Sequence, residues 1–281
     1  MMDWLGETMG LFFAAYGTAL ALALLLPWLG VLLVLRQRVF TAAAVAQSAA
    51  FGFAVGLYFG IGDDHSGHGH DGPLLLLLGA SFGVFAGMFS MQRLRTAAAG
   101  LESWSAVLFL LGSSGSMLLL SNSPHGMQDI QRLQLSSLLG ATPLDLAIAV
   151  ALLAATLVAG IWCGPRILLV ASDEGVAQVL GLPVRAWRTT LGVFIGLCLS
   201  FAIHATGLLF AFGCTVLPVL FVREVAPSLR AVLWLAPSVS VATVGLALWL
   251  AQLEGLDLPP GQTAVAVQAA VVALAMAMRR R

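Results

Sequence analysis

Residues 189–222 read TTLGVFIGLCLSFAIHATGLLFAFGCTVLPVLFV. This apolar stretch decides the topology, because a helix needs only about 20 apolar residues to cross a hydrocarbon layer of about 30 Å. It can form one long tilted helix, or two short helices that turn near residues 205–207. The two interpretations place everything after the stretch on opposite sides of a membrane.

The composition of the chain is that of an integral membrane protein. Of its 281 residues, 60% are apolar and 9% are charged; the net charge is zero and there is no Lys. A soluble domain carries about 25% charged residues. A nucleic-acid-binding protein needs a basic face and a disordered chain needs high charge with few apolar residues, so both classes are excluded. A P-loop ATPase is also excluded, because its phosphate-binding loop contains a lysine.

The apolar runs are rich in Leu and Ala and lack the polar/apolar alternation of barrel strands, so they predict helices. We expect an all-α integral membrane protein, a polytopic bundle of about nine transmembrane helices in a single domain over residues 1–281. The predicted spans are 10–35, 39–61, 74–91, 102–121, 144–163, 189–205, 206–222, 231–253 and 262–278.

Arginine placement favours nine spans over eight, since cytoplasmic loops are enriched in Arg and Lys. With nine spans only Arg132 lies on the outer side. A single helix over 189–222 would move Arg223, Arg230 and the C-terminal arginines to that side. We therefore predict an external amino terminus and a cytoplasmic carboxyl terminus, with eight spans as the alternative. The inner arginines are Arg36, Arg38, Arg93, Arg95, Arg166, Arg185, Arg188, Arg223, Arg230, Arg279, Arg280 and Arg281.

The outer loop 62–73 is rich in histidine and aspartate. Imidazole nitrogens and carboxylate oxygens suit zinc and, less tightly, other first-row divalent ions. We interpret the loop as a metal-collecting segment, the alternative being a polar loop tip without function. Its candidate ligands are Asp64, His65, His68, His70 and Asp71.

The longest inner connection, 164–188, is predicted to contain a short helix on the cytoplasmic face. Ser172 is the expected N-cap, and Asp173 and Glu174 are favourable in the first turn. Gly181 is placed to end the helix and Pro183 prevents its continuation. A soluble partner could bind such an element. An amphipathic helix that lies at the membrane–water interface would have the same sequence pattern and is the alternative.

Two late spans are interrupted by Gly and Pro: Gly207, Gly213 and Pro218 in one, Pro237 and Gly245 in the other. Broken helices are tolerated at membrane depth where they line a cavity, which favours a transporter. Small residues at helix contacts explain the glycines equally well.

Three motifs make the chain resemble the permease subunits of zinc/manganese/iron-type ATP-binding-cassette (ABC) importers, over about residues 27–278. The resemblance lies in the order and spacing of the motifs, since each alone is a weak signal. They are Asp173-Glu174 with Ala177 and Gly181-Leu182-Pro183; Thr206-Gly207-Leu208-Leu209 running on to Leu217-Pro218; and Leu256-Asp257-Leu258-Pro259-Pro260-Gly261-Gln262-Thr263.

The resemblance implies a non-catalytic transport subunit of the bacterial inner membrane. Two copies would form the path, an ABC ATPase dimer would bind the first motif and hydrolyse ATP, and an extracytoplasmic binding protein would deliver a divalent metal ion as substrate. No covalently bound cofactor and no nucleic acid are expected. The ATPase-coupling residues would be Asp173, Glu174, Ala177, Gly181, Leu182 and Pro183.

One position departs from the family. Members typically carry an Asp and, four residues later, a His at the start of the second span, where this chain has Ala43 and Gln47. The remaining candidates for lining the path are Gln47, Ser48, His204 and Cys214. A chelated metal is therefore an alternative cargo.

Two other function classes remain as alternatives. An ion-coupled secondary transporter usually needs ionisable residues inside its spans, and His204 is the clear candidate here. A membrane scaffold would not need the interrupted spans. A neighbouring gene for an ATPase would separate the importer from both.

Overall fold

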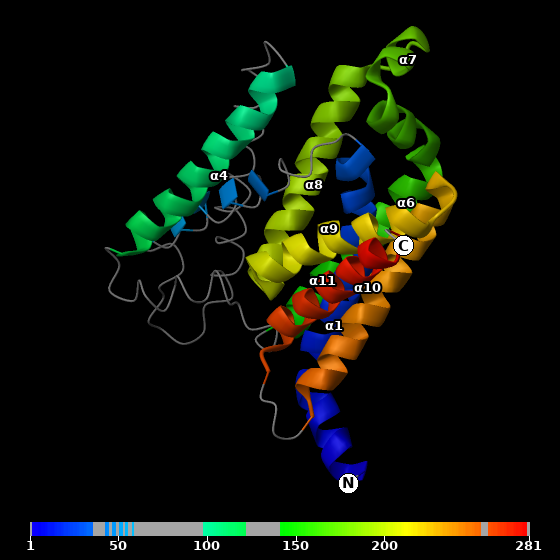
Figure 1. Ribbon diagram of the computed structural model, residues 1–281. Coiled ribbons are helices and arrows are strands. Elements are labelled where there is room, and N and C mark those ends of the chain that lie inside the picture. Colours follow the sequence, from blue (N-terminus) through cyan, green and yellow to red (C-terminus); the bar gives the residue numbers. More distant parts are fainter. Residues whose placement is uncertain are drawn as a thin grey trace. The chain divides into compact units, whose positions relative to one another are not determined.

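A computed structural model describes residues 2–35, 98–121, 141–253 and 258–279, together with the helical residues 43–44, 47–48, 51–52, 54–55 and 58 (Figure 1). The elements in this part are all helices. They are α1 (Met2–Leu35), α4 (Ala98–Ser121), α6 (Pro143–Ser172), α7 (Glu174–Val179), α8 (Val184–Thr206), α9 (Leu208–Val225), α10 (Leu229–Ala251) and α11 (Pro260–Arg279).

Among these described residues, seven helices are long and apolar enough to cross a membrane. The prediction of a polytopic helical protein is confirmed to that extent. The predicted span 74–91 and most of 39–61 lie outside the described residues, so the number of spans and the side of each terminus stay predictions. The seven are Phe13–Leu35, Trp104–Ser121, Pro143–Ser172, Val184–Thr206, Leu208–Val225, Leu229–Ala251 and Pro260–Ala277.

The stretch 189–222 forms two helices rather than one, as its arginine flanks predicted. Helix α8 ends at Thr206 and α9 begins at Leu208. Between them Gly207 has φ 87° and ψ 161°, a backbone region that is essentially restricted to glycine. The single glycine between two apolar runs is therefore what separates the helices.

Helix α6 extends beyond its predicted end at residue 163 and continues to Ser172. Pro165 lies inside the helix and lacks the N–H that would bond the carbonyl of Ile161, but the apolar residues after it keep the helical conformation. At its start, Thr142 and Asp145 form a capping box: the Asp145 carboxylate accepts hydrogen bonds from the Thr142 N–H and hydroxyl, both at 2.8 Å. The Asp145 N–H in turn donates to the Thr142 hydroxyl at 3.3 Å.

The chain divides into two compact units, each assembled from separate stretches. The first comprises 1–34, 135–164 and 205–281, and the second 35–134 and 165–204. Two of the boundaries fall beside Pro165 in α6 and at the end of α8, and the others follow residues 34 and 134. The prediction of a single domain over 1–281 stays a prediction.

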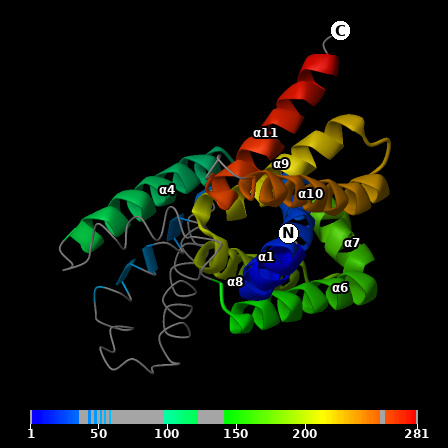
Figure 2. The ribbon, with the colours of Figure 1, turned by 90° about the horizontal axis from the view of Figure 1, so that it is seen from below.

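In the first unit, α9, α10 and α11 pack against one another, and α1 lies between α6 and α10 (Figure 2). The Trp28 ring of α1 meets Trp234 of α10 edge to face, with 5.7 Å between ring centroids. A Cβ on Gly160 of α6 would lie 3.2 Å from the Trp28 ring. A Cβ on Gly30 would collide with the Thr215 carbonyl of α9. Glycine thus lets α1 sit against its neighbours at backbone distance.

In the second unit, α4 packs closely on the described helical residues between 43 and 58. A Cβ on Gly112 would lie 2.7 Å from the Gln47 carbonyl oxygen, and one on Gly115 would lie 2.6 Å from the Phe51 ring. The Gly-x-x-Gly spacing puts both glycines on one face of α4. This face is where the start of the predicted second span is held.

Candidate functional site

The short helix α7 is capped at its start by Asp173 rather than by Ser172. The Asp173 Oδ1 accepts hydrogen bonds from the N–H groups of Gly175 at 2.8 Å and Val176 at 3.1 Å. The predicted N-cap was wrong by one residue, because Ser172 still belongs to α6 and donates its hydroxyl to the Leu168 carbonyl at 2.8 Å. Asp173 is also the better cap electrostatically, since its negative charge faces the positive end of the helix dipole.

The end of α7 is a Schellman motif. Gly181 has φ 76°, its N–H donates to the Gln178 carbonyl at 2.9 Å, and the Leu182 N–H donates to the Ala177 carbonyl at 3.1 Å. The left-handed backbone at Gly181 satisfies carbonyls that the end of a helix leaves free. The predicted role of Gly181 as terminator is confirmed, and Pro183 follows two residues later.

A small apolar core anchors α7 to the helices on either side. Ala177 is fully buried against Val170 of α6 and Val184 of α8, with Leu169, Leu182 and Trp187 packed around them. Sequence reasoning named Ala177 and Leu182 through the family motif but missed the residues of α6 and α8. Their signal was available in the apolar positions on either side of the predicted loop.

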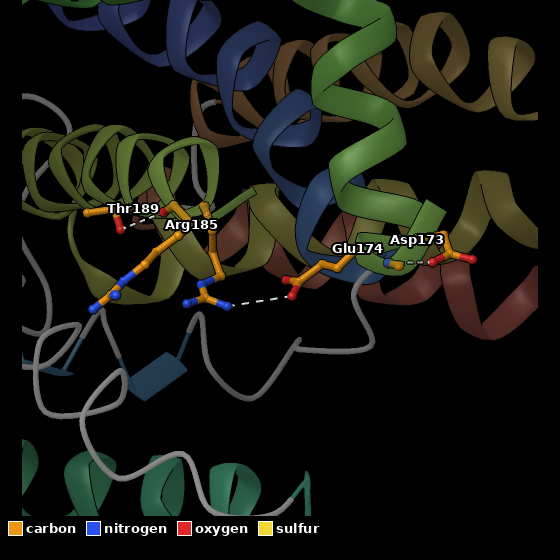
Figure 3. A network of polar contacts seen from close by, with 6 residues as sticks. Asp173, Glu174, Arg185 and Thr189 are labelled. Carbon is orange, nitrogen blue, oxygen red and sulfur yellow. Dashed lines mark hydrogen bonds and ion pairs between the residues drawn. The ribbon is translucent and has the colours of Figure 1, made fainter. Parts of the chain in front are cut away.

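An ion pair adds a second link between α7 and α8. Arg188 Nη1 lies 3.5 Å from Glu174 Oε2, with side chains 18% and 32% exposed (Figure 3). Sequence reasoning treated Arg188 only as an indicator of topology. Its contact with Glu174 could not be predicted from the sequence, because the contact depends on the conformation of the turn between α7 and α8.

The outer face of α7 is apolar and exposed among the residues that the structure describes. Val176, Val179 and Leu180 are 47%, 89% and 65% exposed. Val176 and Val179 lie in a helix that is capped at both ends and fixed at Ala177, and Leu180 is its C-cap residue. The three side chains form an exposed apolar surface on a short, fixed helix. The charged residues Asp173 and Glu174 flank this surface, and Asp173 is exposed.

The second and third motifs approach each other in the first unit. A Cβ on Gly261, at the start of α11, would lie 3.9 Å from the Thr206 carbonyl that precedes the Gly207 break. Thr263 closes the first turn of α11 by donating its N–H and hydroxyl to the Pro259 carbonyl at 3.1 and 2.9 Å. Leu256 and Asp257 of the third motif lie outside the described residues.

The path candidates fall in different units. Gln47 and Ser48 are buried in the second unit, where the Ser48 hydroxyl donates to the Ala44 carbonyl at 2.9 Å, and His204 lies in the last turn of α8. Cys214 is buried in the first unit, where the Gln268 amide Nε2 donates to its sulfur at 3.4 Å. Their role in a path stays a prediction.

The predicted metal-collecting loop 62–73, with Asp64, His65, His68, His70 and Asp71, lies outside the described residues. Within the described ranges, no three His, Cys, Asp or Glu residues come together in a group that could hold a metal ion.

Comparison with known proteins identifies a family whose model matches this sequence and solved structures with a similar fold. The model of the ABC 3 transport family matches residues 9–279. No curated protein sequence matches the chain. Among solved structures, PsaBC from Streptococcus pneumoniae in complex with Fab is similar, with a TM-score of 0.80 and 16% identity over 98% of this chain and 95% of that one.

A second solved structure, an inward-facing conformation described as a metal-chelate type ABC transporter, has a TM-score of 0.72 and 15% identity, covering 98% of this chain and 89% of that one. At these identities the two structures show a shared fold. The family match spans nearly the whole chain and includes all three motifs. This multi-pass membrane protein therefore belongs to the ABC 3 transport family.

Proposed function

We propose that the chain is the permease subunit of an ABC importer for divalent transition metal ions, with zinc as the first candidate and manganese or iron next. Two copies form the transport path, and a separate ATPase dimer supplies the energy. An extracytoplasmic protein delivers the metal. The permease itself is not an enzyme.

The observation that carries the proposal is the form of α7. An element that transmits force must be rigid, and α7 is capped at both ends, fixed by Ala177 and linked to α8 through Glu174 and Arg188. An element that docks must offer apolar surface, and Val176, Val179 and Leu180 do so. Buried apolar anchors with a polar rim are the usual composition of a docking surface.

The orientation follows from charge. Arg185 and Arg188 lie in α8 beside α7, and Arg223 and Arg230 lie at the ends of α9 and α10 that face each other along the chain. Cytoplasmic loops carry such residues. The proposal therefore puts α7 on the cytoplasmic side of a bacterial inner membrane, where ATP and its ATPase are found.

The absence of Lys from the sequence is consistent with transport by this chain and ATP hydrolysis by another. A chain without a phosphate-binding lysine needs a partner for ATP hydrolysis. An ion-coupled carrier is less well supported. Its coupling residues would have to be ionisable side chains within the spans, and the clear candidate in this sequence is the single residue His204.

The cargo is proposed from the family resemblance and from the outer loop 62–73. Ala43 and Gln47 provide no carboxylate or imidazole at the start of the second span, so a bare dication would find no strong ligands there. A dehydrated ion without charge partners faces a large solvation loss in such a path. We propose that the path coordinates weakly and that the external protein selects the metal; a chelated metal is the alternative cargo.

The test is to locate the ATPase contact directly. A photo-crosslinking residue at Val179, whose side chain is 89% exposed, should form an adduct in cells with a protein that contains a phosphate-binding loop and binds ATP. Met276, which is 44% exposed near the end of α11, is the matched control position. Adducts at both positions, or at neither, would contradict α7 as the docking element.

A further inference from the structure

Three polar side chains meet where α9, α10 and α11 pack together. Cys214 of α9 and Ser240 of α10 are 0% exposed, and Gln268 of α11 is 2% exposed. The Gln268 Nε2 donates to the Cys214 sulfur at 3.4 Å, and the Ser240 hydroxyl lies beside the same sulfur. Each residue comes from a different membrane-spanning helix, so the cluster joins all three.

Two oxygens in this cluster lack an ordinary hydrogen bond. Among the described residues, neither Ser240 Oγ nor Gln268 Oε1 has a hydrogen-bond partner. The nearby Cys214 thiol does not replace one, because a thiol is only a weak donor and acceptor. Ser240 is unusual for its helix: the Ser238 hydroxyl donates to the Trp234 carbonyl at 2.9 Å, and the Thr243 hydroxyl donates to the Val239 carbonyl at 2.8 Å. The Ser240 hydroxyl does not bond its own helix and stays with the cluster.

The backbone adds a third acceptor. Pro218 lies inside α9 and has no N–H to donate to the carbonyl of Cys214, four residues earlier. The approach of α11 is close at this level, because a Cβ on Gly213 would lie 2.8 Å from Val265 Cγ2. Neither lipid nor bulk water reaches these buried side chains, so a partner for the two side-chain oxygens would have to be enclosed with them.

A water molecule would match the hydrogen-bonding capacity of these groups. It has two O–H donors, which match the Gln268 carbonyl oxygen and the Cys214 backbone carbonyl, and its oxygen can accept from the Ser240 hydroxyl. Buried waters typically make about three such bonds. A metal ion fits less well, because the cluster contains one thiol and no carboxylate or imidazole.

We infer that α9, α10 and α11 enclose a water-binding site formed by Ser240 Oγ, Gln268 Oε1 and the Cys214 carbonyl. The water bridges three helices whose direct polar contacts in this cluster involve only the weakly hydrogen-bonding Cys214 sulfur. It gives them a polar link that sliding or separation of any one helix would break, so the three helices move as one body.

The first experiment uses the sign of the change in thermal stability. In the purified full-length chain, Ser240→Ala and Gln268→Met should each lower the midpoint of thermal unfolding by about 2 to 4 °C, the shift expected for a lost hydrogen bond or two in a protein of this size. The double variant should lose less than the sum, because either change alone expels the water. Ser238→Ala is the matched control: it removes an exposed hydroxyl from the same helix and should leave the midpoint unchanged.

An empty cluster predicts the opposite. Removing a buried oxygen that has no partner is neutral or stabilising, so an unchanged or raised midpoint in Ser240→Ala would overturn the inference. A structure that resolves ordered water must also show one peak within about 3.2 Å of Ser240 Oγ and Gln268 Oε1. Absence of that peak, or stoichiometric metal that disappears in Cys214→Ala, would overturn it as well.

Discussion

Arg188, near the start of α8, reaches back to Glu174, the first residue of α7, with 3.5 Å between its Nη1 and the Glu174 Oε2. The two residues are fourteen positions apart and lie on either side of the Gly181 turn. An isolated pair with this exposure contributes only about 0.2 to 1 kcal/mol. Its importance is geometric, because it links the helix that we propose as the ATPase contact to the start of α8.

Charge reversal tests this pair. Glu174→Arg should lower metal uptake about tenfold or more, since a docking contact of about 1.4 kcal/mol corresponds to that factor. Membrane insertion should be unaffected. Adding Arg188→Glu should restore part of the uptake if the pair positions α7. Uptake by Glu174→Arg equal to that of the unmodified chain would remove α7 from the coupling mechanism.

Gly181 provides a test of rigidity that leaves the docking surface intact. Its φ of 76° and the open space around it mean that Gly181→Val is opposed by backbone strain and not by a collision. The strain is about 1 to 2 kcal/mol or more, which should unwind the end of α7 and uncouple ATP hydrolysis from uptake. Gly164→Ala is the control, because Gly164 is helical and also has nothing within 4 Å. The measurement is the amount of ATP hydrolysed per metal ion taken up. An equal value of this ratio in the two variants would contradict the prediction.

Gly112→Ala should destabilise the second unit. The added methyl would lie 2.7 Å from the Gln47 carbonyl oxygen, which is backbone and cannot move aside. Overpacking of this kind costs about 1 to 3 kcal/mol, measurable as a lower midpoint of thermal unfolding. Gly164→Ala again serves as the reference, and an equal midpoint in both variants would show that α4 does not pack on the second span in this way.

The outer loop can be tested by deleting residues 62–73. If the loop gathers metal from dilute solution, its loss should raise the metal concentration needed for half-maximal uptake and leave the maximal rate nearly unchanged. Imidazole must be neutral to bind metal, so the contribution of the loop should fade as pH falls below about 6.5. Identical uptake curves with and without the loop would show that it has no such role.

The elements that sequence predicted well are those governed by one local signal. Apolar runs predicted the helices. The arginine flanks predicted a break in the stretch 189–222, and the structure places that break at Gly207, where few other residues adopt the backbone conformation. The end of α7 followed from Gly181 for the same reason. The start of α7 was misplaced because Ser172 and Asp173 are both good caps, and local sequence does not say where α6 stops.

What sequence could not give depends on which helices meet. The Glu174–Arg188 pair, the packing of Gly112 on Gln47 and the Cys214–Gln268 contact each join residues from different helices. Each partner has an unremarkable local context. Their pairing follows from helix packing, which is set by the whole set of apolar faces and not by any one segment.

The second span allows a test of how the cargo is held. Ala43 and Gln47 are four residues apart, the spacing that places two residues on one face of a continuous helix, and each of the two is helical in the structure. The double variant Ala43→Asp with Gln47→His would create a carboxylate and imidazole pair there. We expect the purified variant to retain zinc that the unmodified chain does not, and to release it slowly, because two strong ligands replace weak coordination.

The packing of Gln47 makes this prediction specific. Its backbone is held against Gly112 of α4, so the introduced imidazole would start from a fixed backbone position. It can share a zinc ion with the carboxylate introduced at position 43 only if that face of the helix borders the path. The variants Ala43→Asn with Gln47→His and Ala43→Asp with Gln47→Leu are the controls, since each supplies one strong ligand. Zinc binding by the double variant that is no tighter than in these controls would mean that positions 43 and 47 do not face the metal path.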